Sequence, residues 1–221
     1  MKQTSGIAKN SAMLMAMNIA KMIFPLLTLP YLTRVLSTDC YGSVVYVKSV
    51  TAYLQLLVDF GFVLSATKEI VRVRHDKAAQ EKIMGDVLLA RLWLAGAALV
   101  LLVILTAALP ILRERPLLSL LSFFPVFLTL FLFDFLFRGL EKMEAIALRF
   151  VVMRGVATAL TFVLIHSDRD VLLIPLLDTL GTLIAALMVL PQLRRLGLHA
   201  GAGLRLAFTK IGNDFWVIRL K

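Results

Sequence analysis

Six long apolar runs, joined by short polar loops, take up most of this chain. They cover residues 11–32, 42–71, 87–109, 117–137, 145–165 and 171–190. Each is close to or above the ~20 apolar residues that a helix needs to cross the bilayer core. Since a segment in lipid must pair its own backbone groups, the runs predict an all-α integral membrane protein with about six transmembrane helices in one bundle.

The charge pattern supports a membrane protein and excludes two other classes. Only 17% of residues are charged, against about a quarter in soluble domains. The net charge is +10, but the basic residues gather in the loops and form no nucleic-acid-binding face, so we expect no nucleic-acid partner. A single cysteine, Cys40, excludes an internal disulfide. No cofactor fingerprint or metal-ligand spacing is present, and we expect neither a cofactor nor a metal.

Lysine and arginine are also unevenly divided between alternate loops. They are concentrated at the N-terminus and after the second, fourth and sixth runs, which places these segments and the N-terminus in the cytoplasm. The first run has no small-residue cleavage site near its end, so we expect it to be retained as a span. Residues 1–192 are thus predicted to form one six-helix lobe. Residues 193–221 are predicted to be a cytoplasmic Gly-rich link and the start of an amphipathic or truncated seventh helix.

The first run contains two prolines, Pro25 and Pro30. Proline removes a backbone hydrogen bond and crowds the preceding helical turn. In lipid this is tolerated where neighbouring groups or water satisfy the freed backbone. We therefore expect the first helix to bend and to line a polar space.

Charged residues also occur inside the runs, where each costs roughly 2.5–3.5 kcal/mol at a helix centre. They are Lys21, Lys48, Asp59, Asp134, Arg154 and Asp178. Such residues usually face a bundle interior or a water-filled cavity. Their spacing agrees: Asp59 follows Lys48 by three helical turns, and Thr182 follows Asp178 by about one. The pattern predicts a bundle around a hydrated, charged cavity.

Lys21, Lys48 and Arg154 are the predicted binding residues for an anionic group such as phosphate, since arginine and lysine both bind it. Asp59 and Asp178 are the candidates for coupling an ion. Structural explanations remain for some charges. Asp134 would pair with Arg138 four residues on, Lys48 would extend to the interface, and Asp59 would pair with a basic loop residue.

Two motifs give the chain a family resemblance. The segment PLLTLPYLTRVLSTDCYG, followed by SVTAYLQLLVDFGFVLSATKEIVRVR, resembles the N-terminal region of the polysaccharide (O-antigen, Wzx-type) flippases. FRGLEKM at residues 137–143 is similar to the FQGxEKM of that family, at the inner end of the fourth span. Arg138 stands where the family has glutamine, followed by Gly139 and Glu141 as in the motif.

The resemblance implies a carrier, not an enzyme, in a bacterial inner membrane. Its cargo would be an undecaprenyl-pyrophosphate-linked oligosaccharide, moved from the inner to the outer leaflet for O-antigen, capsule or exopolysaccharide export. Partners would be this cargo, membrane lipids, and the polysaccharide polymerase and ligase machinery. Such proteins have two similar lobes facing a cationic cavity and work by alternating access. This chain corresponds to the N-terminal lobe alone, and is either a fragment or a homodimer.

Three alternatives remain open at this point. One is a cation-coupled exporter of the multidrug and toxin extrusion type, which YLTRVLSTDCYG and RGLEKM disfavour. Another is a membrane-bound transferase or phosphatase acting on polyprenyl phosphate, which needs a cluster of catalytic residues at one face. The third is an inactive, truncated remnant or assembly partner in glycan export.

Overall fold

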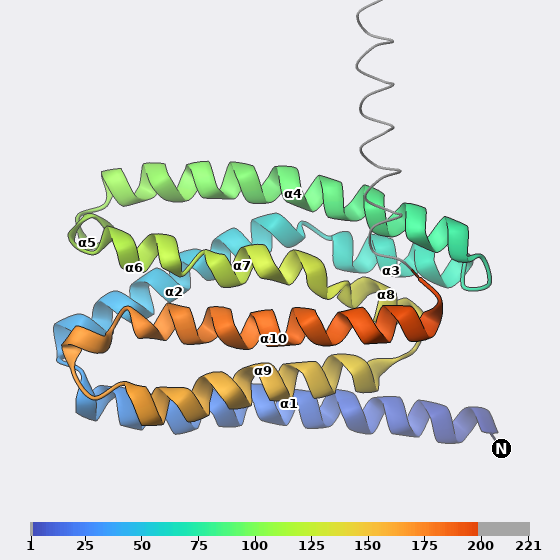
Figure 1. Cartoon of the computed structure of the whole chain (residues 1–221), viewed down its shortest axis with the longest axis horizontal. Coiled ribbons are helices and arrows are strands. Elements are labelled where there is room, and N and C mark those ends of the chain that lie inside the picture. Colours follow the sequence, from blue (N-terminus) through green and yellow to red (C-terminus); the bar gives the residue numbers. More distant parts are fainter. Residues whose placement is uncertain (1, 199–221) are drawn as a thin grey trace, which may run out of the picture.

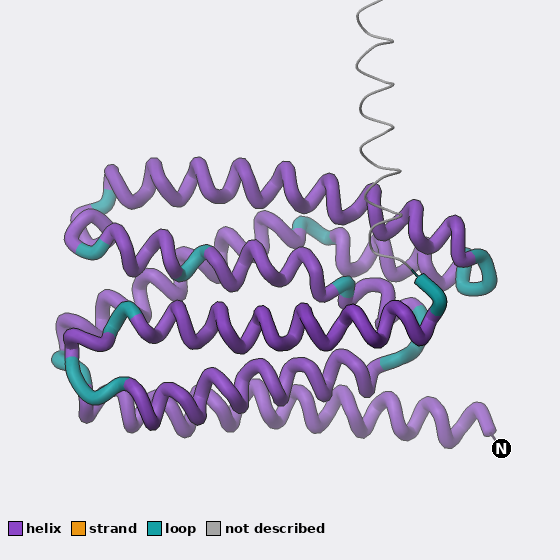
Figure 2. Tube along the Cα trace, in the orientation of Figure 1, coloured by secondary structure: helices purple, strands orange, loops and turns teal. Residues whose placement is uncertain are grey.

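The computed structural model describes residues 2–198, with side chains from residue 11 onward, and within this part every regular element is a helix (Figures 1 and 2). Of the predicted tail, residues 193–221, the part beyond residue 198 lies outside the described residues, whereas residues 193–196 continue the sixth long helix, which runs through Pro191 and past its predicted end at residue 190. In chain order the elements are α1 (Lys2–Val35), α2 (Thr38–Asp59), α3 (Phe62–Arg72), α4 (Lys77–Ala108), α5 (Pro110–Glu114), α6 (Pro116–Leu121), α7 (Phe124–Thr129), η1 (Leu130–Leu132), α8 (Asp134–Gly139), α9 (Met143–Leu164), η2 (Asp168–Asp170) and α10 (Leu173–Leu196).

Within residues 2–198, six helical stretches are long and apolar enough to cross a membrane, which confirms the predicted all-α membrane bundle. The third begins at Lys77, ten residues before the predicted start at residue 87. The reason is local. The side chain of Asp76 caps the new start by accepting a hydrogen bond from the N–H of Ala79 at 3.1 Å. Buried Gln80 donates to the carbonyl oxygens of Val73 and Arg74, so this polar turn is held against the end of α3.

The prolines of the first span do not interrupt it, since α1 continues through Pro25 and Pro30. The second and fourth spans are interrupted instead. The second breaks between α2 and α3, where Phe60 and Gly61 have φ values of 24° and 77°. The fourth is divided into α6, α7, η1 and α8, with Phe133 at φ 48° just before α8. Both breaks follow or precede an aspartate, Asp59 or Asp134, and so place a carboxylate beside unwound backbone.

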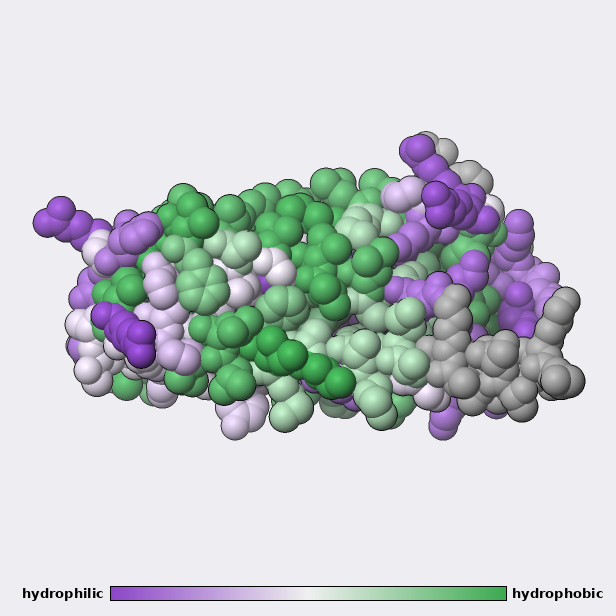
Figure 3. Space-filling view, turned by 90° about the horizontal axis from the view of Figure 1, so that it is seen from below, coloured by the Kyte–Doolittle hydropathy of each residue, from purple (hydrophilic) through white to green (hydrophobic). Residues whose placement is uncertain are grey.

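The long helices lie side by side, and the loops that join one span to the next lie at the two ends of the bundle, whereas the breaks within the second and fourth spans lie between these ends (Figures 1 and 2). α9 packs between α1 and α10, and α3 packs against α8. Seen from below, apolar side chains cover the middle of the molecule and hydrophilic ones gather at its two ends (Figure 3). This distribution is the one a membrane-spanning bundle requires, with a lipid-facing belt between two water-facing ends.

At the end of the bundle where α1 meets α2, hydrogen bonds and a ring contact join parts of the chain that are distant in sequence. The hydroxyl of Tyr31 donates to the carbonyl oxygen of Ile165 at 2.7 Å, and its ring contacts Phe162 at 4.6 Å between centroids. The N–H of Ser37 donates to Asp168 at 2.8 Å. The end of α1 is therefore fastened to the α9–α10 connection.

Candidate functional site

A groove lined by charged side chains among apolar ones runs through the bundle between the long helices. Its first part is a cavity of about 550 Å³ lined by residues of α1 to α4 and of α7 to α10, and its second part is a cavity of about 510 Å³ extending toward the end where α1 meets α2. Five residues line both parts and mark where they meet: Lys21, Lys48, Phe150, Arg154 and Asp178. We call these five residues the waist of the groove.

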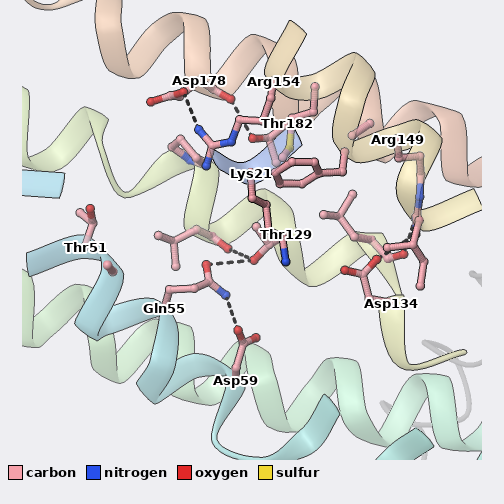
Figure 4. Close-up of a pocket in the computed structure, with 18 of the residues that line it drawn as sticks. Lys21, Thr51, Gln55, Asp59, Thr129, Asp134, Arg149, Arg154, Asp178 and Thr182 are labelled. Atoms are coloured by element: carbon pink, nitrogen blue, oxygen red, sulfur yellow. Dashed lines mark hydrogen bonds and ion pairs between the residues drawn. The ribbon is translucent and has the colours of Figure 1, made fainter. Parts of the chain in front are cut away.

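At the waist, one carboxylate forms ion pairs with two cationic side chains. Asp178 of α10 forms an ion pair with Lys48 of α2, 2.9 Å between Nζ and Oδ2, and accepts a hydrogen bond from Arg154 Nη1 of α9 at 3.2 Å through Oδ1. The latter pair is drawn in Figure 4. Lys48 and Arg154 each keep 46% of their side chains exposed. The pairing is thus open to water and leaves a surplus of positive charge.

Lys21 adds a third cation from α1. Its Nζ lies 5.6 Å from the ring centroid of Phe150, within reach of a cation–π contact. Among the described residues no carboxylate lies within 4.0 Å of this amine. Lys21 points into the groove in Figure 4, so its charge is available to an incoming anion.

The other end of the first cavity carries three arginines and two aspartates. We call it the arginine end: Asp59, Arg91, Asp134, Arg138 and Arg149. Here each aspartate has an arginine of its own, and Arg138 forms no ion pair with either. Arg91 Nη2 of α4 lies 2.6 Å from Asp59 Oδ1, and Arg149 Nη2 of α9 lies 2.8 Å from Asp134 Oδ1.

Each of these ion pairs lies at one of the two helix breaks, between α2 and α3 or just before α8. Arg149 also donates to the carbonyl oxygens of Leu132 at 2.6 Å and Ala145 at 3.1 Å, and stacks on Phe137 at 4.6 Å. It therefore satisfies backbone that the break before α8 leaves unpaired. Only 2% of the surface of Arg149 is exposed, so its role is to hold α9 against the break before α8.

A hydrogen-bond chain supports the other break. Gln55 Nε2 donates to Asp59 at 3.0 Å, and the hydroxyl of Thr129 donates to Gln55 Oε1 at 3.2 Å (Figure 4). Together with the Arg91–Asp59 ion pair, these hydrogen bonds connect α2, α4 and α7 at the point where the second span is interrupted. Each polar group that faces inward from α2 thus has a partner, as low-dielectric surroundings demand.

The sequence predictions map onto this groove as follows. The predicted anion-binding residues Lys21, Lys48 and Arg154 meet at the waist with Asp178, and Asp59 lies at the arginine end. In the fourth-span motif the three residues separate: Arg138 lines the first cavity, Gly139 packs tightly against Ile70, and Glu141 lies exposed in the turn before α9 with φ 57°. Their functional roles stay predictions.

Two buried arginines were missed, and one suggested pair does not form. Asp134 pairs with Arg149 of the next span and not with Arg138. Arg91 and Arg149 lie inside the predicted runs 87–109 and 145–165, but neither is in the predicted set of intramembrane charges. The signal for both was available, since each unpaired intramembrane aspartate needs a cation from another helix.

Fold and groove together define a multi-pass α-helical membrane protein with a charged cavity between its spans. The chain belongs to the polysaccharide biosynthesis protein family, whose model matches residues 7–210. It is 28% identical over 189 residues to a putative O-antigen transporter of Shigella dysenteriae, covering 85% of this chain and 47% of that protein. It is 26% identical over 169 residues to a putative O-antigen transporter of Escherichia coli K12, covering 76% and 40%.

The chain therefore spans about half the length of the curated relatives that it matches. No solved structure matches it.

Proposed function

We propose that this chain forms one lobe of a flippase that moves a polyprenyl-pyrophosphate-linked oligosaccharide from the inner to the outer leaflet of a bacterial inner membrane. The observation that carries the proposal is the surplus of positive charge in a groove within the apolar belt. Of the charged residues that line the first cavity, six are basic and three acidic. A pyrophosphate needs such an environment to leave water and cross the membrane.

The waist is the proposed pyrophosphate site. Lys21, Lys48 and Arg154 converge there from three helices, and the one carboxylate at the waist, Asp178, pairs with Lys48 and Arg154 only. A bound pyrophosphate would bond the two cations in place of Asp178 and take the additional charge of Lys21. Asp178 and Asp59 are the proposed ion-coupling residues, because each is a carboxylate whose partner is a cation inside the groove.

The same charge disfavours the alternative transport function. An exporter of cationic drugs would draw a positive substrate into a groove in which basic side chains outnumber acidic ones two to one. Like charges in a desolvated site repel strongly. The cargo we propose is anionic, and the chain acts as a non-enzymatic carrier.

Relatives of about twice this length support a two-lobe carrier. The second lobe would come from another polypeptide or from a second copy of this chain, and would close the groove against lipid. The loop charges place the N-terminus in the cytoplasm under this proposal. The glycan polymerase and ligase would then act on the delivered cargo at the outer leaflet.

Complementation tests the proposal. The full chain, alone and coexpressed with the C-terminal half of a related transporter, is expressed in a flippase-null bacterium, and surface polysaccharide is measured on gels. Where glycan is restored, Lys21→Ala and Arg154→Ala should lower it at least tenfold at unchanged protein level. Arg113→Ala, which removes an exposed cation on α5 outside the groove, is the matched control and should keep full export.

The proposal fails if both groove variants export as much glycan as the control at equal protein levels. Glycan from the chain alone would identify a homodimer as the working unit. Glycan only with the C-terminal half would identify the second lobe as essential.

A further inference from the structure

We propose that Arg138 forms a second anion site in the groove, separate from the waist, and that its ligand is a carboxylate on the oligosaccharide. The cargo would thus include an acidic sugar, such as a hexuronic acid. This inference rests on the proposed transport function and adds the chemical class of the glycan.

The first step is that the carboxylates of the arginine end are already bound. Asp59 is held by Arg91 at 2.6 Å, and Asp134 is held by Arg149 at 2.8 Å. Among the described residues, no carboxylate lies within 4.0 Å of the guanidinium of Arg138. Its Nε is shielded from solvent and has no hydrogen-bond partner in this part of the chain. Arg138 is therefore a cation of the cavity without a paired anion.

The second step is that Arg138 is held in place. Gly139, the next residue, packs so closely that an added Cβ would lie 2.6 Å from Ile70 Cγ2 and 3.1 Å from the carbonyl oxygen of Thr67. The hydroxyl of Thr67 donates to the carbonyl oxygen of Phe135 at 3.3 Å. Because α8 is fixed against α3 in this way, Arg138 has a fixed backbone position at the cavity wall and needs little ordering to bind.

The third step is that this site is distinct from the waist. The waist residues line both parts of the groove, whereas Arg138 lines the first cavity only. In that cavity Asp134 and Arg149 lie on the side away from Asp178 and Arg154 (Figure 4). Arg138 is one helical turn beyond Asp134 on α8. An anion at Arg138 and one at the waist would thus occupy different places.

The fourth step compares charges. The waist has three cations and one carboxylate, an excess that matches the two negative charges of a pyrophosphate diester. At the arginine end two of the three arginines are neutralised by aspartates, and only Arg138 remains in excess. One further carboxylate on the glycan would balance it, and arginine binds carboxylate in a planar, two-bond geometry.

A lipid headgroup phosphate could supply the same kind of anion to Arg138. The partial burial of the side chain and its place on the cavity wall favour the glycan, since a headgroup would reach it only by entering the groove. The experiment below separates the two sources.

The test uses the full chain in phosphatidylcholine nanodiscs and two short-chain ligands. Both are geranyl-diphosphate-linked disaccharides, one ending in glucuronic acid and the other in glucose, and binding is measured by titration calorimetry. We expect the wild-type protein to bind the uronic-acid ligand about tenfold more tightly. Arg138→Gln, which keeps length and hydrogen bonding without the charge, should reduce this ratio to about one. Lys21→Ala should weaken both ligands equally, and Arg113→Gln should change neither.

Each of the other possible results contradicts either the acidic-sugar site or the proposed transport function. Equal affinity of the wild-type protein for both ligands, or a preference that Arg138→Gln leaves intact, overturns the acidic-sugar site while the waist stands. A preference that disappears when phosphatidylglycerol is added to the nanodiscs assigns Arg138 to lipid phosphate and also overturns it. If the wild-type protein binds neither ligand, both the site and the proposed function fail.

Discussion

The two charged regions of the groove, the arginine end and the waist, differ in how their charged side chains are paired and in how far they are buried. At the arginine end, Arg91 and Arg149 are 5% and 2% exposed, and each has its own aspartate. At the waist, Lys48 and Arg154 are half exposed and share Asp178. Buried charges must be paired because desolvation is costly, whereas hydrated charges tolerate a surplus. The comparison separates charges that hold the fold together from charges left free to bind.

Removing Arg149 should have the largest effect. Arg149→Ala would leave Asp134 beside unpaired backbone and remove two further hydrogen bonds to carbonyl groups. Breaking one side of a buried pair costs about 3–5 kcal/mol. We expect a large loss of folded protein in the membrane and a sharply lower unfolding temperature in detergent. Arg154→Ala is the matched waist control and should lower that temperature little; equal losses for both variants would contradict the distinction.

Neutralising the shared carboxylate should affect binding more than stability. Asp178→Asn leaves Lys48 and Arg154 without their anion, and both are hydrated enough to tolerate it. We expect a change in unfolding free energy within about 1 kcal/mol. Affinity for inorganic pyrophosphate, measured by calorimetry on the full chain in nanodiscs, should rise severalfold. Weaker binding would show that Asp178 organises the waist cations and does not compete for them.

The smallest effect is expected at an exposed carboxylate outside the membrane-spanning helices. Hydrogen bonds from the side chain and backbone of Ser37 hold the pKa of Asp168 below its usual value of 3.8. Since the folded-state pKa is the lower one, the contact stabilises the protein above pH 3.8 and is lost as the pH falls through the lowered value. Asp168→Asn should slightly flatten the fall in unfolding temperature below about pH 4. Asp86→Asn, on an exposed part of α4, should leave that fall unchanged.

Much of this arrangement is predictable from the residues, and the remainder has identifiable causes. The six spans follow from apolar length alone. Lys21, Lys48, Arg154 and Asp178 stand out because intramembrane charges are rare, and helical spacing puts them on inward faces. The waist is thus within reach of sequence reasoning.

The helix breaks, in contrast, cannot be predicted from the sequence. Phe60 and Phe133 adopt positive φ, which no local sequence signal favours, and the prolines at 25 and 30 lie in an unbroken helix instead. Tertiary contacts decide these positions: Arg149 stabilises the break before α8 from another span. A pair such as Asp134–Arg149 depends on how two spans meet across a turn, and a single span gives no information on that.

The close approach of α9 and α10 makes the two ion pairs of Asp178 unequal. A Cβ at Gly181 would collide with the carbonyl oxygen of Met153, so the two helix backbones are in direct contact beside Arg154 and Asp178. Any displacement that keeps this contact leaves the Arg154–Asp178 ion pair intact. Lys48 reaches Asp178 from α2, so a displacement of α2 relative to α10 would break the Lys48–Asp178 ion pair first.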